Sequence, residues 1–200
     1  MLVLGCRRPR PIMYPPNERR FDPACEATSA AELSAARRDS LPPDDSRWNP
    51  NRSAAEWARA VPGGFAGMYG DPFHSSQFVV MLQDTTITLE SIRALEQRLS
   101  AFYRRPIMLT LARRRVARWN SAQLYDWYRF LMPRAMRPPY ATSAAIDIIQ
   151  NRLRFGISTD SSADALAAYL RSLAVPCGLV EIAIEPPAVA GMGFIPRPKR

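Results

Sequence analysis

Residues 146–157 constrain the fold more than any other stretch, because apolar and polar residues alternate on both sides of a polar dipeptide. The apolar positions are Ile146, Ile148, Leu153, Phe155 and Ile157, and the polar dipeptide is Asn151-Arg152. Alternation with a period of two is typical of strands that bury one face, and a short polar break between two such runs is typical of a tight turn. The sequence therefore predicts an antiparallel β-hairpin.

Strands and helices are also predicted on both sides of this hairpin. The predicted strands are 65–69, 77–82, 107–111 and 180–185, and the predicted helices run from Thr88 to Tyr103, from Asn120 to Pro133 and from Ser161 to Leu173. In the first of these helices, apolar residues recur at helical spacing on one face. Burial of that face explains the pattern without any functional role.

The order of these elements is ββα-βαββαβ, which indicates an α+β domain over residues 63–185 with helices packed on one side of antiparallel sheet. Two arrangements are open. In the first, the last six elements form one four-stranded antiparallel sheet with two helices on one face. In the second, a strand–strand–helix–strand unit occurs twice, within 63–112 and within 120–185.

Residues 7–62 are rich in Pro, Arg and Ala, and we expect a largely disordered or loosely docked arm. Capping-box spacings predict short helices over 29–38 and 53–60. Neither helix has enough apolar residues to hold its place alone. Residues 186–200 form a Pro-rich, basic tail.

Residues 1–6 resemble the end of a bacterial lipoprotein signal, in which Cys6 is the lipidated residue. A signal peptide needs an apolar run of about 7–15 residues, and the run before Cys6 is shorter. Two readings are open: the true start lies upstream of Met1, or the short apolar N-terminus has no targeting role. The first places the protein in the cell envelope, with a lipid on Cys6 as its only membrane contact, and the second places it in the cytoplasm.

The three cysteines, Cys6, Cys25 and Cys177, do not have the spacing of a metal site. We expect no metal and no cofactor. Cys25 and Cys177 can form a disulfide in an oxidising compartment, but the sequence favours two free thiols.

Catalysis is not expected. The only histidine, His74, lies in a predicted turn between two strands, where imidazole groups are usually solvated. The chain contains no Gly-x-Ser-x-Gly elbow and no Gly-rich phosphate loop. Acidic residues of the second half lie at outward-facing positions or at helix caps, where carboxylates are solvated or favoured by the helix dipole. The sequence therefore predicts a protein that is not an enzyme.

A net charge of +9 permits an acidic partner, and a nucleic acid is the alternative partner. The strongest basic patch comprises Arg113, Arg114, Arg115, Arg118 and Trp119. The order βαββαβ is also that of the RNA recognition motif, which stacks bases on aromatic residues of its third strand. Here Phe155 shares its strand face with Leu153 and Ile157, so we expect it in the core. Nucleic acid is therefore the less favoured partner.

Four short stretches, in order, resemble the pro-region of secreted bacterial serine peptidases of the alpha-lytic-protease and streptogrisin type. They are the strand pair Phe65–Tyr69 and Phe78–Leu82, the helix start Ser121–Leu124, the hairpin Ile146–Leu153 and the closing strand Leu179–Ile182. The chain departs from that family because no peptidase domain follows and the Gly-Asp-Ser-Gly-Gly nucleophile segment is absent.

The resemblance implies a folding assistant and inhibitor that adds its sheet to a hairpin of a serine peptidase, here in trans or with only the scaffold retained. It implies a binding surface at the sheet edge within residues 140–185, together with the tail from Pro186. The candidate partner-binding residues are Asn151, Arg152, Arg154, Glu181 and Glu185. We therefore expect a non-catalytic protein-interaction domain of the cell envelope.

Overall fold

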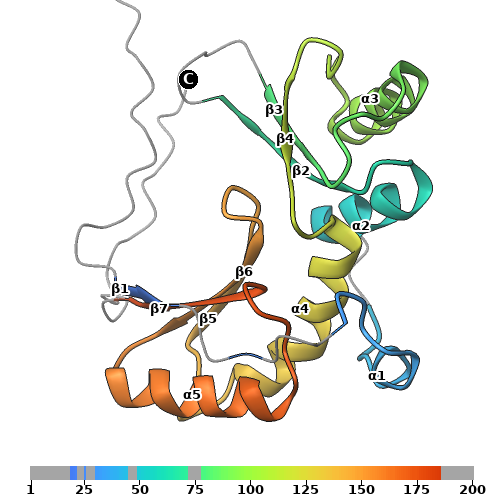
Figure 1. Cartoon of the computed structure of the whole chain (residues 1–200). Helices are drawn as coiled ribbons and strands as arrows, with labels where there is room; N and C mark the ends of the chain where they lie inside the picture. The colour runs from blue at the N-terminus through green and yellow to red at the C-terminus, as the bar shows by residue number, and fades with distance from the viewer. Residues whose placement is uncertain (1–18, 22–24, 26–29, 45–48, 72–77, 186–200) are drawn as a thin grey trace, which may run out of the picture.

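The computed structural model describes residues 19–21, 25, 30–44, 49–71 and 78–185, which form a mixed α+β fold with two sheets (Figure 1). The four-stranded sheet has the order β1-β7-β6-β5, and the three-stranded sheet has the order β2-β3-β4. The strands are β1 (Arg19–Phe21), β2 (Phe65–Gly70), β3 (Phe78–Leu82), β4 (Arg113–Val116), β5 (Ser143–Asp147), β6 (Arg152–Ile157) and β7 (Val180–Ile184). The α+β prediction is thus confirmed.

The four-stranded sheet contains the predicted hairpin, but Ile148, expected in a strand, lies in the turn, and Arg152, expected in the turn, begins β6. β5 pairs antiparallel with β6, and Ile146 lies opposite Leu153. β6 pairs in parallel with β7, and the chain crosses between them through α5 (Asp160–Ser172). Apolar residues of β6 and β7 pack with those of α5 and α4 (Ser121–Ala135) in one core. Both helices therefore cover the same face of this sheet, as the alternation in sequence requires.

The three-stranded sheet has its own core. Phe65, Val80 and Leu82 pack against α3 (Leu89–Tyr103), which buries Ile92 and Leu95. Thr88 caps this helix, because its hydroxyl accepts a hydrogen bond from the backbone N–H of Ser91. β2 and β3 are antiparallel, whereas β3 and β4 are parallel.

The third predicted strand was placed at the wrong residues. The structure has no strand at 107–111, and β4 begins at Arg113 instead. Ile107 and Leu109 are buried in the core of the three-stranded sheet, so the apolar pattern reflects packing of a loop segment. The edge of β3 pairs with the following arginine segment.

β4 also decides between the two arrangements that the sequence left open. Because β4 lies in the sheet of β2 and β3, the last six elements do not form one four-stranded sheet. The arrangement of two successive units describes the chain better. Both sheets contain a parallel pair, so the expectation of purely antiparallel sheet was wrong.

Part of the expected N-terminal arm is ordered. The helix α2 (Pro50–Ala60) begins at an Asn49 cap and buries Ala55 and Trp57, and the short helix α1 (Ala35–Asp39) precedes it. Figure 1 shows α2 beside α4 and the three-stranded sheet. The expectation of a largely disordered arm therefore does not hold for the described residues of 19–62. Cys6, His74 and the tail from Pro186 lie outside the described residues.

Cys25 and Cys177 form a disulfide, whereas the sequence favoured free thiols. The two residues are 152 positions apart, so no local pattern brings them together. The bridge joins the segment after β1 to the loop before β7. Within the described ranges, no helix has the length and apolar character needed to span a membrane.

Candidate functional site

Asn151 holds the hairpin turn against the segment between β4 and α4. Its side-chain carbonyl accepts a hydrogen bond from the backbone N–H of Trp119 (2.8 Å), and its amide donates to the Trp119 carbonyl (2.7 Å). Asn151 is buried and has a φ of 55°, a left-handed conformation that Asn tolerates better than most residues. These contacts give Asn151 a role within the chain.

Arg152, Arg154, Glu181 and Glu185 lie on the sheet face opposite α4 and α5. Arg154 Nη2 is 3.0 Å from Glu185 Oε1, and Arg152 Nη1 is 3.9 Å from Glu181 Oε2. The Ser143 hydroxyl also donates to Glu185 (2.9 Å), so polar contacts link β5, β6 and β7. A Cβ atom on Gly156 would lie 2.2 Å from the Ser143 oxygen, which explains glycine at this position.

These four residues do not form a sheet edge. β6 and β7 are the two interior strands, each paired on both sides, and the ends of the sheet are β1 and β5. Arg152 pairs with Glu181, and Arg154 pairs with Glu185. These four residues therefore do not lie on a sheet edge, although β5, which is also within residues 140–185, does end the sheet. Their sheet face is polar as expected, but Glu181 is buried, so the expectation that it faces solvent was wrong.

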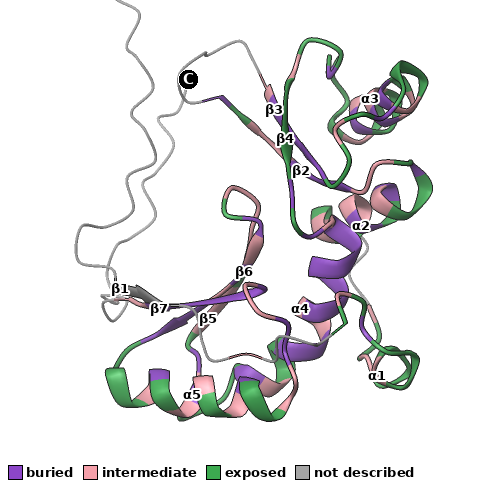
Figure 2. Ribbon diagram, viewed as in Figure 1, coloured by how far each residue is buried: buried purple, intermediate pink, exposed green. Residues whose placement is uncertain are grey.

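β4 provides an edge with a different character. It ends the three-stranded sheet and, in the described part of the chain, pairs only with β3. Each residue from Arg113 to Val116 is exposed, and Figure 2 shows the strand in green along its length. Sequence reasoning identified these arginines as a basic patch but missed the strand, because the run has no apolar alternation.

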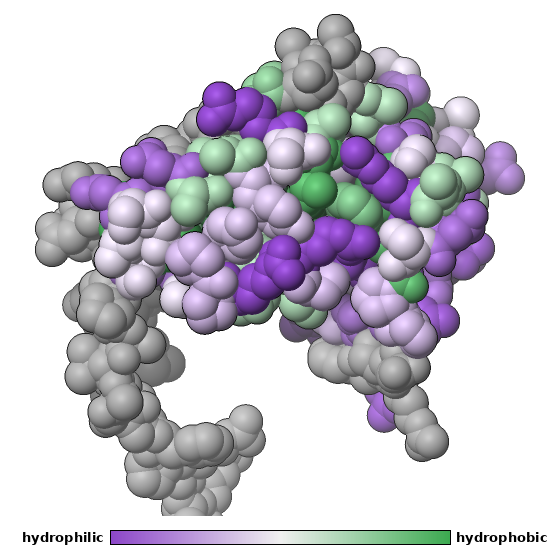
Figure 3. All heavy atoms as spheres, turned by 90° about the horizontal axis from the view of Figure 1, so that it is seen from below, coloured by the Kyte–Doolittle hydropathy of each residue, from purple (hydrophilic) through white to green (hydrophobic). Residues whose placement is uncertain are grey.

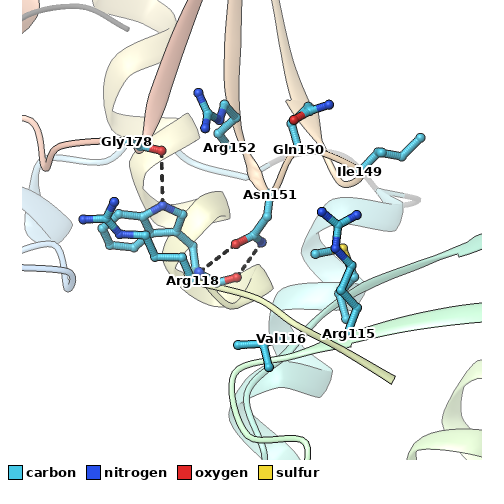
Figure 4. Close-up of a pocket in the computed structure, with 10 residues that line it drawn as sticks. Arg115, Val116, Arg118, Ile149, Gln150, Asn151, Arg152 and Gly178 are labelled. Carbon is cyan, nitrogen blue, oxygen red and sulfur yellow. Dashed lines mark hydrogen bonds between the residues drawn. The ribbon is translucent and has the colours of Figure 1, made fainter. Parts of the chain in front are cut away.

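A pocket of about 200 Å³ lies where the end of β4 meets the hairpin turn (Figure 4). We call it the arginine pocket; its wall includes Arg115, Val116, Arg118, Gln150, Arg152 and Gly178. Figure 4 shows Arg115 reaching from β4 toward the turn, with Arg118 and Gly178 on the other side of Asn151. Two segments distant in sequence, 115–118 and the hairpin turn, thus contribute cationic side chains.

Two cations of the arginine pocket, Arg115 and Arg118, are not paired with an acidic group of the described residues. Arg115 Nη1 donates to the Tyr69 hydroxyl (3.3 Å), and the Arg118 guanidinium lies 4.9 Å from the centre of the Trp119 ring. Neither forms an ion pair with a carboxylate of the described residues. Arg152 faces Glu181 instead. The pocket is therefore suited to an anionic group.

In a second pocket, between α2 and α4, acidic side chains of the pocket wall pair with two of its arginines. Arg59 Nη2 is 2.7 Å from Asp126 Oδ1, and Arg52 pairs with Glu56 across one helical turn (3.0 Å). The Tyr125 hydroxyl donates to the Asp44 carboxylate. Burial of the phenol raises the pKa of Tyr125 well above its usual value, and the hydrogen bond to Asp44 raises it further. Tyr125 therefore stays protonated through neutral pH, and the Arg59–Asp126 pair joins α2 to α4.

The face on the α5 side has a mixed surface. Figure 3 shows hydrophilic and hydrophobic residues interspersed over its described part. Strongly exposed apolar side chains occur instead around β4, where Leu111 is 71% exposed and Val116 is 67% exposed. Among the described residues, no three His, Cys, Asp or Glu side chains are grouped in a way that suits a metal ion. The strongest candidate site is therefore the β4 edge with the arginine pocket.

No model of a protein family, no curated protein and no solved structure matches this chain. The resemblance to peptidase pro-regions therefore remains a prediction from short sequence stretches.

Proposed function

We propose that this chain is a non-catalytic protein-interaction domain that binds an extended segment of a partner protein along β4. The observation that carries the proposal is the position of β4 at the end of its sheet with all four residues exposed. An end strand presents unpaired backbone N–H and C=O groups, and a partner segment can pair with them as an added strand. In this proposal the binding edge is β4 rather than the edge strand β5 within residues 140–185.

The positive charge of β4 favours a partner segment with negative charge. Arg113, Arg114 and Arg115 alternate between the two faces of the strand, so an added strand meets guanidinium groups on both faces. Opposite charges on neighbouring strands stabilise pairing, and like charges destabilise it. Two copies of β4 therefore repel each other, whereas an acidic, extended segment is attracted.

The disulfide supports an oxidising location for this function. Disulfides persist outside the cytosol and are rare within it, and Cys25–Cys177 joins two parts of the four-stranded-sheet region. We therefore propose an extracytoplasmic or cell-envelope location. Lipidation of Cys6 stays a prediction.

The resemblance to pro-regions suggests a narrower form of the proposal, in which the partner is a secreted serine peptidase. Strand addition to a peptidase hairpin requires no catalytic residue in this chain, in keeping with the prediction that it is not an enzyme. A panel of purified secreted serine peptidases tests this form by inhibition and direct binding. Absence of both would contradict the peptidase partner but not strand addition itself.

Peptides of defined sequence test strand addition. The probe is a fluorescent peptide with alternating Glu and Val and blocked termini, and the control peptide has Lys in place of Glu. We expect the protein to bind the Glu peptide at least about tenfold more tightly, measured by fluorescence anisotropy at low salt. Equal binding of the two peptides, or no binding of either, would contradict the proposal.

Charge reversal on β4 gives a positive control. The Arg113→Glu/Arg114→Glu variant should prefer the Lys peptide, because the charges that face the added strand are inverted. Arg98→Glu on α3, outside both sheets, should leave the preference unchanged.

A single-stranded oligonucleotide distinguishes the alternative function. The cluster of arginines on β4 favours a nucleic acid, and such binding would weaken steeply with salt. Tight oligonucleotide binding without binding of the Glu peptide would replace the proposed function by nucleic-acid recognition.

A further inference from the structure

We propose that the arginine pocket is a carboxylate site, which receives one acidic side chain of the segment bound along β4. Because the acidic side chain belongs to a segment bound along β4, the site in this form rests on the proposed function. The strand and the pocket are continuous. Arg115 and Val116 belong both to the exposed strand and to the wall of the pocket. A segment that pairs with β4 therefore runs past the pocket mouth.

Arg118 is exposed, but its guanidinium has neighbours on two sides. Its guanidinium packs on the Trp119 ring and over Gly178, where an added Cβ would lie only 2.7 Å from Arg118 Nη1. The Trp119 indole N–H in turn contacts the Gly178 carbonyl (3.4 Å). Glycine at 178, with a φ of 76°, leaves the space that Arg118 uses. A cation that already packs against neighbours loses less conformational entropy when a ligand arrives than one that does not.

The opposite wall is also held in place. Asn151 joins the hairpin turn to the Trp119 backbone through two hydrogen bonds, and Arg115 contacts the Tyr69 hydroxyl. Ile148, at the start of the turn, packs against Gly67 of β2, where a Cβ would come within 2.5 Å of it. The turn is therefore anchored both to the β4–α4 connection and to the three-stranded sheet. The distance between the two walls is set by the fold.

The donors of the pocket call for a carboxylate. A guanidinium has five N–H donors in a planar fork, which matches the two oxygens of a carboxylate. One contact of Arg115 is to a neutral hydroxyl and that of Arg118 is to a ring, so neither cation has its charge neutralised by them. The pocket between α2 and α4 differs, because two of its arginines, Arg59 and Arg52, already pair with Asp126 and Glu56.

A small anion tests the pocket independently of strand addition. Sodium acetate is titrated into the full chain at constant ionic strength, and the Trp119 indole and Gly178 amide resonances are followed by NMR. We expect a saturable shift with a Kd on the order of 10 mM, because a ligand of so few atoms binds weakly. Arg115→Gln and Arg118→Gln should each remove saturation, whereas Arg113→Gln on the same strand should not.

Two outcomes of the titration would overturn the carboxylate site. The first is the absence of a saturable shift in the wild-type protein. The second is saturation by inorganic phosphate without saturation by acetate, which would identify a phosphate site. Unchanged denaturant unfolding of both glutamine variants ensures that a lost shift reports the pocket rather than the fold.

The Glu–Val peptide then tests the coupling to β4. Each Glu is replaced in turn by Gln, and one replacement should weaken binding to the wild-type protein at least about tenfold. That loss should vanish in Arg115→Gln and Arg118→Gln and persist in Arg113→Gln. Peptide binding with equal effects at every Glu would contradict the inference but leave the proposed function standing. Acetate binding without peptide binding would support a carboxylate site in the pocket but contradict the proposed function.

Discussion

At the scale of single residues, the candidate positions divide into those that hold the chain together and those that remain available to a ligand. Asn151 belongs to the first group, because both ends of its side-chain amide bond the Trp119 backbone. Arg154 and Glu185 belong there too, through their ion pair. Arg115 and Arg118 belong to the second group. All five residues are polar and lie in loops or strands, so the two groups differ only in whether the side chain has a strong polar partner within the chain.

Asn151→Ala should destabilise the fold by about 2–4 kcal/mol. The change leaves a buried backbone N–H and C=O of Trp119 without their partners, and it places alanine in a left-handed conformation. Denaturant unfolding measures the loss. Gln150→Ala, in the same turn but exposed, is the matched control and should change stability by less than about 0.5 kcal/mol. Equal effects of the two changes would contradict the role given to Asn151.

At the scale of elements, α2 shows how a segment with few apolar residues becomes ordered. The Asn49 side chain accepts hydrogen bonds from the N–H groups of Asn51 and Arg52, which satisfies the start of the helix. Trp57 then packs against Phe65 and Phe102, with ring centres 6.1 and 5.2 Å apart. An amphipathic helix is stable here because tertiary contacts, rather than local propensity, hold it.

Trp57→Ala should cost about 3–5 kcal/mol, the usual range for removal of a large buried aromatic side chain. Glu56→Ala on the exposed side of α2 removes only the surface pair with Arg52 and should cost under about 1 kcal/mol. Thermal and denaturant unfolding of both variants provide the comparison. A small effect of the tryptophan change would mean that α2 is loosely docked, as the composition alone suggests.

At the scale of the whole molecule, two connections join segments that are far apart in the chain. The first is the hairpin turn, in which Ile148 packs with Ala66, Met81 and Ala117 of the three-stranded sheet region. The second is the Cys25–Cys177 disulfide, which encloses most of the chain in one covalent loop. A long loop restricts the unfolded chain more than a short one does.

Replacing Cys25 and Cys177 together by Ser should lower stability by about 2–5 kcal/mol, because the unfolded chain regains the freedom of the open loop. Cys6→Ser is the control and should leave the unfolding midpoint unchanged. The measurement is denaturant unfolding of the wild type with and without reductant, beside both variants. If reductant has no effect on the wild type, the disulfide does not form in solution.

Several features were predictable because they depend on local sequence. Alternation of apolar residues predicted β5 and β6 as a hairpin, and helical spacing predicted α3 with its Thr88 cap. The apolar run at 107–111 misled because a buried loop and a buried strand have the same composition. The arginines of β4 were not predicted as a strand, because they lack apolar alternation and form a strand through pairing with β3.

The sequence by itself determined the α+β class, the hairpin with Asn151 at its turn, and the polar face of β6 and β7, because these follow from the periodicity of neighbouring residues. Only the tertiary structure decided which strands lie at sheet ends, that Cys25 meets Cys177, and that Arg115 and Arg118 face one pocket. These features join segments far apart in the chain. Their pairing depends on the packing of whole elements, which no local pattern records.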